Sequence, residues 1–436
     1  MRSIVILVSS ILLAAGCGNS EAPAPAPPPF ALENGLKVIL HPMPTAEKVA
    51  LVVLYSVGGL HDPKGQSGLA HLVEHCYVTA AAGSTPARDI QQYVARYGDG
   101  WNAQTGDDYT VVACVVPPGA LEAELADAAA RMTHLGVVDA DLEREKPRLA
   151  AELDNMYGGI PMLGVRNLGR EKVCPYPHRG RKGGLAEEVR VIPLAAVQEH
   201  LKRYYKPQCA MLVLAGAFDA ASARAAVEKH FGPIPAGDAA PQPPPCPKPI
   251  LPINGVVETK PLQPGAAATV GLTFAAPPPD SDLFAPFLLL VARLTGRAHT
   301  LSAGPGQMPV QYAAIDDPAA VSVVAPLAAN EPPEAAIARL EKFVSDAVAD
   351  PTAATSDRMV AKQQFAFALG LLNLPDAMLA QNVYGVAFAL GRRAQMGIDP
   401  AALQGAVEAA TTEDLQRAAV AIFSPQVRAA MVVVPQ

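Results

Sequence analysis

Two stretches of this 436-residue chain follow one pattern, and this internal repeat most constrains the fold. One stretch begins at Ala195 and the other at Glu413, which lies 218 residues later. Each has a helical pattern that closes with an aromatic residue, one variable residue, Pro and Gln, and an apolar run follows, over Met211–Ala215 and Ala429–Val434. The repeat predicts two homologous domains of mixed secondary structure.

The remaining patterns favour the α+β class. Val49–Val57 and Tyr109–Val116 are rich in Val, Leu and Tyr, which is typical of strands. Helical periodicity marks several other segments, which are Leu121–Leu135, Ser222–Phe231, Leu283–Leu294, Pro333–Ala349 and Ser356–Leu371. Strands and helices do not alternate strictly, so we expect antiparallel-rich sheets with helices on one face. We expect domains at residues 31–233 and 253–436, joined by a Pro-rich linker at residues 234–252.

The N-terminus has the features of a processing segment. A short positive start is followed by an apolar run of about 12 to 14 residues that ends within Leu13–Cys17, and Leu13–Cys17 resembles a bacterial lipobox. We expect a signal peptide at residues 1–17, lipidation of Cys17, and a Pro/Ala-rich tether at residues 18–30. Because Gly18 and not Asp follows the cysteine, we expect an outer-membrane anchor that faces the periplasm. A plain secretory signal is the alternative; the apolar run is too short for a membrane span.

His71-Leu72-Val73-Glu74-His75 carries the clearest chemical pattern. On a helix, residues i and i+4 lie on one face, so His71 and His75 can direct two imidazole nitrogens at one metal ion. Glu74 can stand beside the metal and accept a proton from a bound water. The alternative is an exposed polar helix face. The flanking residues are largely apolar, which predicts a buried group that a metal would satisfy.

A catalytic zinc site needs a third protein ligand and keeps one position open. The residue types that can serve occur at His61, His134, Glu143, Glu145 and Glu152. Glu145 and Glu152 are two helical turns apart and would share one face, so that one could ligate and the other support. Pro147 lies between them and is expected to bend the helix or to start it.

Taken together, these motifs resemble the pitrilysin/insulinase family of zinc metallopeptidases, the inverzincins. The likeness is greatest to the short two-domain branch near mitochondrial processing peptidase, and it covers about residues 30 to 436. Besides the histidine motif, it rests on Leu32–Val38, Gly58-Gly59, Asn102–Thr105, the paired glutamates, and Tyr204–Gly216.

The resemblance implies two domains that face each other across a cavity, with one Zn²⁺ ion held by His71, His75 and Glu152. It implies that Glu74 is the general base and that Glu145 orients either a metal ligand or the region around Glu74. The expected activity is that of a zinc metalloendopeptidase on extended peptides or unfolded polypeptides.

The stretch Asn102–Thr105 resembles the family's active-site edge strand. We expect Asn102 and Ala103 to lie where a peptide substrate could add as a β-strand.

The second domain departs from the active pattern. The 218-residue offset places Leu289–Arg293 opposite the histidine motif, and this segment has no His or Glu, so no second zinc site is expected. Active single-chain relatives offer an Arg and a Tyr seven residues apart. Tyr312 is the candidate for the Tyr, with a plain strand aromatic as the alternative, but Pro305 stands at the Arg position. The hypothesis is that a partner supplies the pair, either a homologous non-zinc subunit or a second copy.

Several functions other than peptidase activity are alternatives for this chain. A net charge of −7 and the absence of a long basic tract argue against a nucleic-acid partner. An inactive scaffold or assembly subunit remains the main alternative, and a zinc-storage or chaperone protein is a second. Five cysteines follow Cys17, and their pairing cannot be deduced from sequence.

Overall fold

The structure is a computed structural model. It describes residues 27–98, 100–173, 183–239, 250–259, 266–298, 301, 309–349, 355–366 and 376–435. Several predicted features lie outside these ranges, namely the signal peptide with Cys17, most of the tether, the middle of the linker, Pro305, Cys174 and Cys246. Within the described ranges, none of the helices combines the length and apolarity that crossing a bilayer requires.

The first half of the chain forms a six-stranded sheet in the order β1-β2-β8-β3-β6-β5. Its neighbouring strands are antiparallel except for β2 and β8, which are parallel. The strands are β1 (Phe30–Ala31), β2 (Lys37–Pro42), β3 (Val49–Tyr55), β5 (Trp101–Thr105), β6 (Thr110–Val116) and β8 (Ala210–Gly216). A separate small pair joins β4 (Ala81–Ala82) and β7 (Leu135–Gly136).

The second half forms a five-stranded sheet in the order β11-β12-β10-β13-β9. Here too one pair is parallel, β9 with β13, and the others are antiparallel. The strands are β9 (Ile253–Thr259), β10 (Thr269–Ala275), β11 (Val310–Ala313), β12 (Asp317–Pro326) and β13 (Arg428–Pro435).

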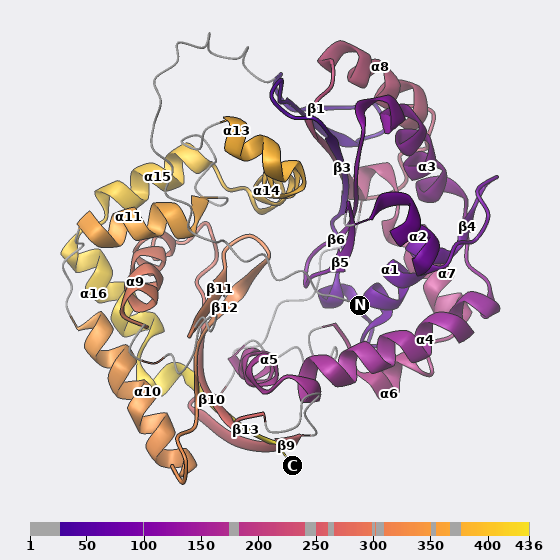
Figure 1. Cartoon of the computed structure of the whole chain (residues 1–436). Helices are drawn as coiled ribbons and strands as arrows, with labels where there is room; N and C mark the ends of the chain where they lie inside the picture. The colour runs from indigo at the N-terminus through magenta and orange to yellow at the C-terminus, as the bar shows by residue number, and fades with distance from the viewer. Residues whose placement is uncertain are drawn as a thin grey trace.

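The described helices divide between the two halves, and Figure 1 shows them around the two sheets. Those of the first half are α1 (Leu69–Thr79), α2 (Ile90–Tyr97), α3 (Leu121–His134), α4 (Asp139–Asp154), α5 (Pro161–Val173), α6 (Ala186–Val189), α7 (Leu194–Tyr204) and α8 (Ala220–Phe231). Those of the second half are α9 (Phe284–Arg297), α10 (Pro333–Val348), α11 (Thr355–Gln364), α13 (Asp376–Leu379), α14 (Val383–Met396), α15 (Pro400–Ala409) and α16 (Thr412–Ile422).

The two halves repeat one topology, as the sequence predicts. The order β2-β8-β3-β6-β5 matches β9-β13-β10-β12-β11, with the parallel pair in the same place. Helix α7 and helix α16 differ by 218 residues at both ends, which is the offset of the sequence repeat. The α+β class with two homologous halves is therefore confirmed.

In the described parts of the chain, each sheet packs its own helices on one face and a helix from the other half on the opposite face. Helix α14 lies against β3 and β8 of the first sheet, and α5 lies against β10, β12 and β13 of the second sheet (Figure 1). The sequence did not predict that a helix of the other half covers the second face of each sheet. It explains why β3, with the sequence VALVVLY, is apolar at every position and buried throughout: both of its faces meet helices.

Helices α5 and α14 each pack on the sheet of the other half, and we call them the exchanged helices. Both contain the sequence Leu-Gly-Arg near the centre, at residues 168–170 of α5 and 390–392 of α14. The glycine of each helix packs directly against a sheet strand. A Cβ atom on Gly169 would lie 2.8 Å from Cβ of Thr273 and closer still to its hydroxyl, and one on Gly391 would overlap the side chain of Leu54. Only glycine therefore lets these helices approach so closely.

Replacing Gly169 by Ala is expected to lower the free energy of unfolding by about 1–3 kcal/mol, because the added methyl group overpacks the contact with β10. Helix propensity alone would favour Ala by about 1 kcal/mol. Gly405→Ala in α15 is the matched control, since a Cβ there meets no atom within 4 Å. Denaturant unfolding measures both variants, and a stabilised Gly169→Ala protein would contradict the packing described here.

Candidate active site

Helix α1 carries the histidine motif and is held at both ends. The carboxylate of Asp62 accepts hydrogen bonds from the backbone nitrogens of Gly68 (2.7 Å) and Ala70 (2.8 Å) at its N-terminus. At the other end the buried guanidinium of Arg131 donates to the carbonyl oxygen of Tyr77 (2.6 Å). Such contacts satisfy backbone groups that a helix leaves unpaired, so the helix is fixed in place along its axis.

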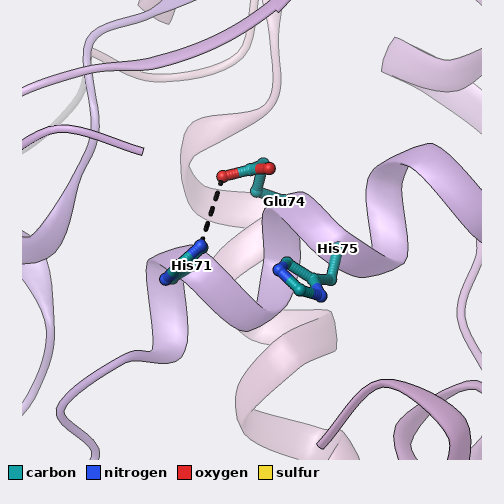
Figure 2. A group of neighbouring side chains, drawn as sticks. All are labelled: His71, Glu74 and His75. Atoms are coloured by element: carbon teal, nitrogen blue, oxygen red, sulfur yellow. Dashed lines mark ion pairs between the residues drawn. The ribbon is translucent and has the colours of Figure 1, made fainter. Parts of the chain in front are cut away.

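His71 and His75 lie one turn apart on α1, with Glu74 beside them (Figure 2). Nδ1 of His71 is 3.1 Å from the carbonyl oxygen of Gly183, and Nδ1 of His75 is 3.5 Å from a carboxylate oxygen of Glu145. These partners engage the Nδ1 atoms and fix the ring orientations. The Nε2 atoms are left for another partner, as in metal-binding histidines.

Glu152, on α4, faces both histidines. Its two carboxylate oxygens lie 3.7 Å from Nε2 of His71 and 3.8 Å from Nε2 of His75. Glu145 lies two turns earlier on the same face of α4, as its spacing predicts. Its side chain is only 1% exposed, and Arg144 and Arg148 donate hydrogen bonds to it. Burial acts to raise the pKa of Glu145, but the interactions with His75, Arg144 and Arg148 together hold this pKa below its usual value.

Helix α4 runs through Pro147 and begins at Asp139, so it does not start at the proline. Pro147 cannot donate a hydrogen bond to the carbonyl oxygen of Glu143, four residues earlier. Both residues are exposed, so water can satisfy that oxygen. The proline therefore leaves the shared face of the two glutamates intact.

Glu74 is buried next to the edge strand of the first sheet. Its carboxylate accepts a 2.8 Å hydrogen bond from the hydroxyl of Thr105 and lies 3.8 Å from Nε2 of His71. Burial raises the pKa of Glu74 to about 7, although His71 and the Thr105 hydrogen bond both act to lower it. A carboxyl group with a pKa near neutrality is suited to both accepting and releasing a proton.

The donor set fits a zinc ion. Two imidazoles and one carboxylate form a recurrent catalytic zinc set, which leaves a fourth position open. The separations of 3.7 and 3.8 Å between Nε2 and carboxylate oxygens are near the ~3.3 Å expected between ligands at tetrahedral zinc. Carboxylate oxygens of Glu74 and Glu152 lie 3.8 and 3.7 Å from Nε2 of His71, and a divalent cation there would balance their negative charge.

Strand β5 forms an edge of the first sheet in the described structure, so one side of its backbone has no neighbouring strand there. It contains Asn102 and Ala103, as expected, and ends at Thr105 beside Glu74. The side chain of Asn102 points to the far face of the sheet, where it donates to the hydroxyl of Tyr384 at 2.7 Å. Any substrate contact at Asn102 would therefore be made by its main chain.

Two family models match this chain. The model for insulinase (peptidase family M16) covers residues 37–157, and the model for the peptidase M16 inactive domain covers residues 192–302. The chain belongs to the insulinase (M16) family of peptidases. The first match contains the histidine motif together with Glu145 and Glu152 of α4.

Relatives of this M16 protein include proteases with zinc in their names. The zinc protease PqqE of Helicobacter pylori is 25% identical over 237 residues, which are 53% of this chain and 52% of that protein. The alignment thus spans about half of that relative. Among solved structures, a Helicobacter pylori protease superposes with a TM-score of 0.76, at 17% identity, over 94% of this chain and 99% of that one. The periplasmic protease PqqL of Escherichia coli gives a TM-score of 0.67, at 15% identity, over 95% and 48% of the two chains. At these identities the superpositions show a shared fold.

Tyr312 lies apart from the histidines, on β11 in the second half of the M16 chain. Its ring packs edge-on against Phe287 of α9 at 4.9 Å and against Phe365 at 5.9 Å, within the second half's core. A substrate role for Tyr312 stays a prediction.

Sequence reasoning missed three residues that support the site, namely Thr105, Asp62 and Arg131. Thr105 was part of the edge-strand motif without an assigned role. Asp62 stands six residues before Gly68, the N-cap of α1, so no standard capping position marked it. No local sequence pattern marks Arg131, because it is distant from α1 in the sequence and contacts that helix only in the folded structure.

Replacing Glu145 by Gln is expected to weaken zinc binding about 10- to 100-fold, because the amide no longer supports His75 as a charged acceptor. Competition with a chromophoric chelator at pH 7 measures the affinity. Glu143→Gln, an exposed position on the same helix, is the matched control. Equal affinities in the two variants would show that Glu145 has no influence on the metal.

Proposed function

We propose that this M16 protein is a zinc-dependent endopeptidase that cleaves extended peptides or unfolded polypeptides. The supporting observation is the convergence of His71, His75 and Glu152 next to the buried carboxylate of Glu74, beside an edge strand. The first three residues would hold the metal. A Zn²⁺ ion bound there would lower the pKa of a water molecule and polarise the scissile carbonyl.

Glu74 is the proton carrier in this proposal. It would accept a proton from the attacking water and donate it to the departing amine, as general base and then general acid. Thr105 would orient the carboxylate through its hydrogen bond. Glu145 would keep the ring of His75 in its ligating orientation from behind.

The substrate would bind as an added strand on β5. Main-chain hydrogen bonds to Asn102 and Ala103 would fix the peptide in extended form, whereas side chains would be read only weakly. Protein loops held in compact folds would be poor substrates, because an added strand needs an accessible extended segment.

The Arg–Tyr pair expected of active relatives is incomplete in this sequence, since Pro305 stands at the Arg position. We assign the missing function to a partner, a homologous non-zinc subunit or a second copy. Cleavage by the purified chain alone, at the rate observed with its genomic neighbour added, would refute this assignment.

The proposed location is the cell envelope, with a lipid on Cys17 anchoring the protein to the outer membrane on its periplasmic side. The support is the lipobox-like sequence, together with the likeness to a protease described as periplasmic. Radiolabelled palmitate incorporation that is lost in Cys17→Ser would test it.

An inactive scaffold is the alternative function. The match of residues 192–302 to a model named for inactive domains favours it. A quenched library of extended peptides decides between the two, with zinc content measured on the same sample. The proposal expects about one zinc per chain and cleavage that a chelator abolishes. A zinc-loaded protein that cleaves nothing, with or without its partner, would support the scaffold.

A further inference from the structure

The exchanged helices place two buried arginines on one turn of the first sheet. Arg170 of α5 forms an ion pair with Asp107, and Arg392 of α14 forms one with Asp108 at 3.1 Å. The two aspartates are neighbours in the turn that joins β5 to β6, which we call the β5–β6 turn, residues 106–109. Both arginines follow the glycines that bring their helices against the sheets.

Arg392 has the larger set of partners. Its side chain is 0% exposed, Nε donates to the carbonyl oxygen of Ile315 at 2.8 Å, and Nη1 donates to Gln395 at 2.7 Å. The guanidinium also lies 4.1 Å from the centre of the Tyr109 ring, within cation–π range. Arg392 therefore joins the β5–β6 turn to the turn between β11 and β12 of the second half.

The far face of β5 meets the second half in the same way. Asn102 donates to the hydroxyl of Tyr384 at 2.7 Å, and Gln104 donates to the carboxylate of Asp316 at 2.6 Å. The hydroxyl of Tyr109 also donates to Asp316. Asn102 and Gln104, the polar side chains on this face of β5, thus donate hydrogen bonds to residues of the second half, which lacks the histidine motif.

The opposite side of the β5–β6 turn leads directly to Glu74. Thr105, the residue before the turn, donates to the Glu74 carboxylate from the other face of β5. The carbonyl oxygens of Gly106 and Asp107 accept from the backbone nitrogens of Gly59 (3.0 Å) and Leu60 (2.8 Å). That segment continues to Asp62, which holds the start of α1. A displacement of the turn would reach both the Thr105 hydrogen bond and the histidine helix.

We infer that Arg392 is a positioning residue: through Asp108 and the β5–β6 turn, the second half holds Thr105 against Glu74. This inference rests on the proposed function for its kinetic consequence, whereas the structural coupling can be tested without it. It gives the half without zinc ligands a role in the active site of its own chain, separate from any contact with substrate.

Arg392→Met removes the ion pair, and it leaves Asp108 with 42% of its side chain exposed, so no unpaired charge is buried there. Arg293→Met is the matched control. Arg293 is also a buried arginine, and it pairs with Asp357 at 2.7 Å between α9 and α11 of the second half. Asp108→Asn is a milder second variant if Arg392→Met folds poorly.

Amide hydrogen exchange gives the first measurement. In the zinc-loaded full chain, Arg392→Met is expected to speed exchange over residues 101–110 about tenfold, whereas Arg293→Met speeds it over residues 284–297 and 355–364. Unchanged exchange over residues 101–110 in both Arg392→Met and Asp108→Asn would overturn the inference. Uniformly faster exchange over the whole chain would also overturn it, because it would indicate general destabilisation.

Kinetics with a quenched extended peptide give the second measurement. Arg392→Met and Thr105→Val are each expected to lower kcat about tenfold with zinc content and KM nearly unchanged, and the double variant is expected to lose about tenfold, not hundredfold. Multiplicative losses, or an equal loss in Arg293→Met, would overturn the coupling. If the wild-type protein cleaves nothing, the proposed function fails, and the exchange measurement alone decides the inference.

Discussion

Replacing Glu74 by Gln is expected to lower kcat by about 10²–10⁴-fold with zinc still bound. The amide keeps the shape of the carboxylate and can still accept from Thr105, but it cannot take a proton from water. Zinc should remain because the ligands in our proposal are His71, His75 and Glu152. Both expectations, the loss of kcat and the retention of zinc, are tested by measuring peptide cleavage and metal content on the same preparation.

Glu124→Gln is the control for the loss of a buried carboxylate as such. Glu124 accepts hydrogen bonds from Arg96 and Tyr97, away from the histidines. This variant should lose stability but keep kcat. If Glu74→Gln retained more than a tenth of the wild-type kcat, Glu74 would not be the proton carrier. If it lost its zinc, Glu74 would belong to the ligand set.

His75→Ala should abolish both zinc binding and peptide cleavage. Removal of one of three ligands leaves two donors, which are too few to retain the ion against a chelator. Glu145 keeps its contacts with Arg144 and Arg148, so the charge behind His75 stays paired. A wild-type protein with zinc at 1,000 times its Kd gains about 4 kcal/mol of stability, and the variant should lose this gain.

Thermal unfolding with and without a chelator measures that difference. The wild-type Tm should fall when zinc is removed, whereas the Tm of His75→Ala should not respond. His134→Ala is the matched control, because His134 is a residue of the same type on the exposed end of α3. One zinc ion per chain in purified His75→Ala would refute the ligand set.

The repeated topology could be predicted from sequence because its signals are local. A helix pattern, an aromatic residue and Pro-Gln recur at a constant offset, and the structure shows α7 and α16 at that offset. The crossing of α5 and α14 could not be predicted in this way. An amphipathic pattern tells which side of a helix is buried, but not which of two similar sheets it covers.

In the candidate site too, features that depend on local spacing could be predicted, whereas contacts between distant elements could not. The i,i+4 spacing of His71 and His75 and the seven-residue spacing of Glu145 and Glu152 place each pair on one helix face, as the structure shows. The contact of Thr105 with Glu74 joins a strand to a helix, and the distance between them depends on how the sheet packs. No periodicity within either element encodes it.

The exchange of α5 and α14 has a practical consequence for expression of parts of the chain. Residues 31–233 alone would lack α14, and the apolar side chains of Ala50, Val52 and Leu54 on β3 would face water. A large apolar patch of this kind promotes self-association. A truncated first half is therefore expected to be insoluble or to form dimers by exchanging segments. The two halves should yield soluble protein as separate polypeptides only when both are expressed in the same cell.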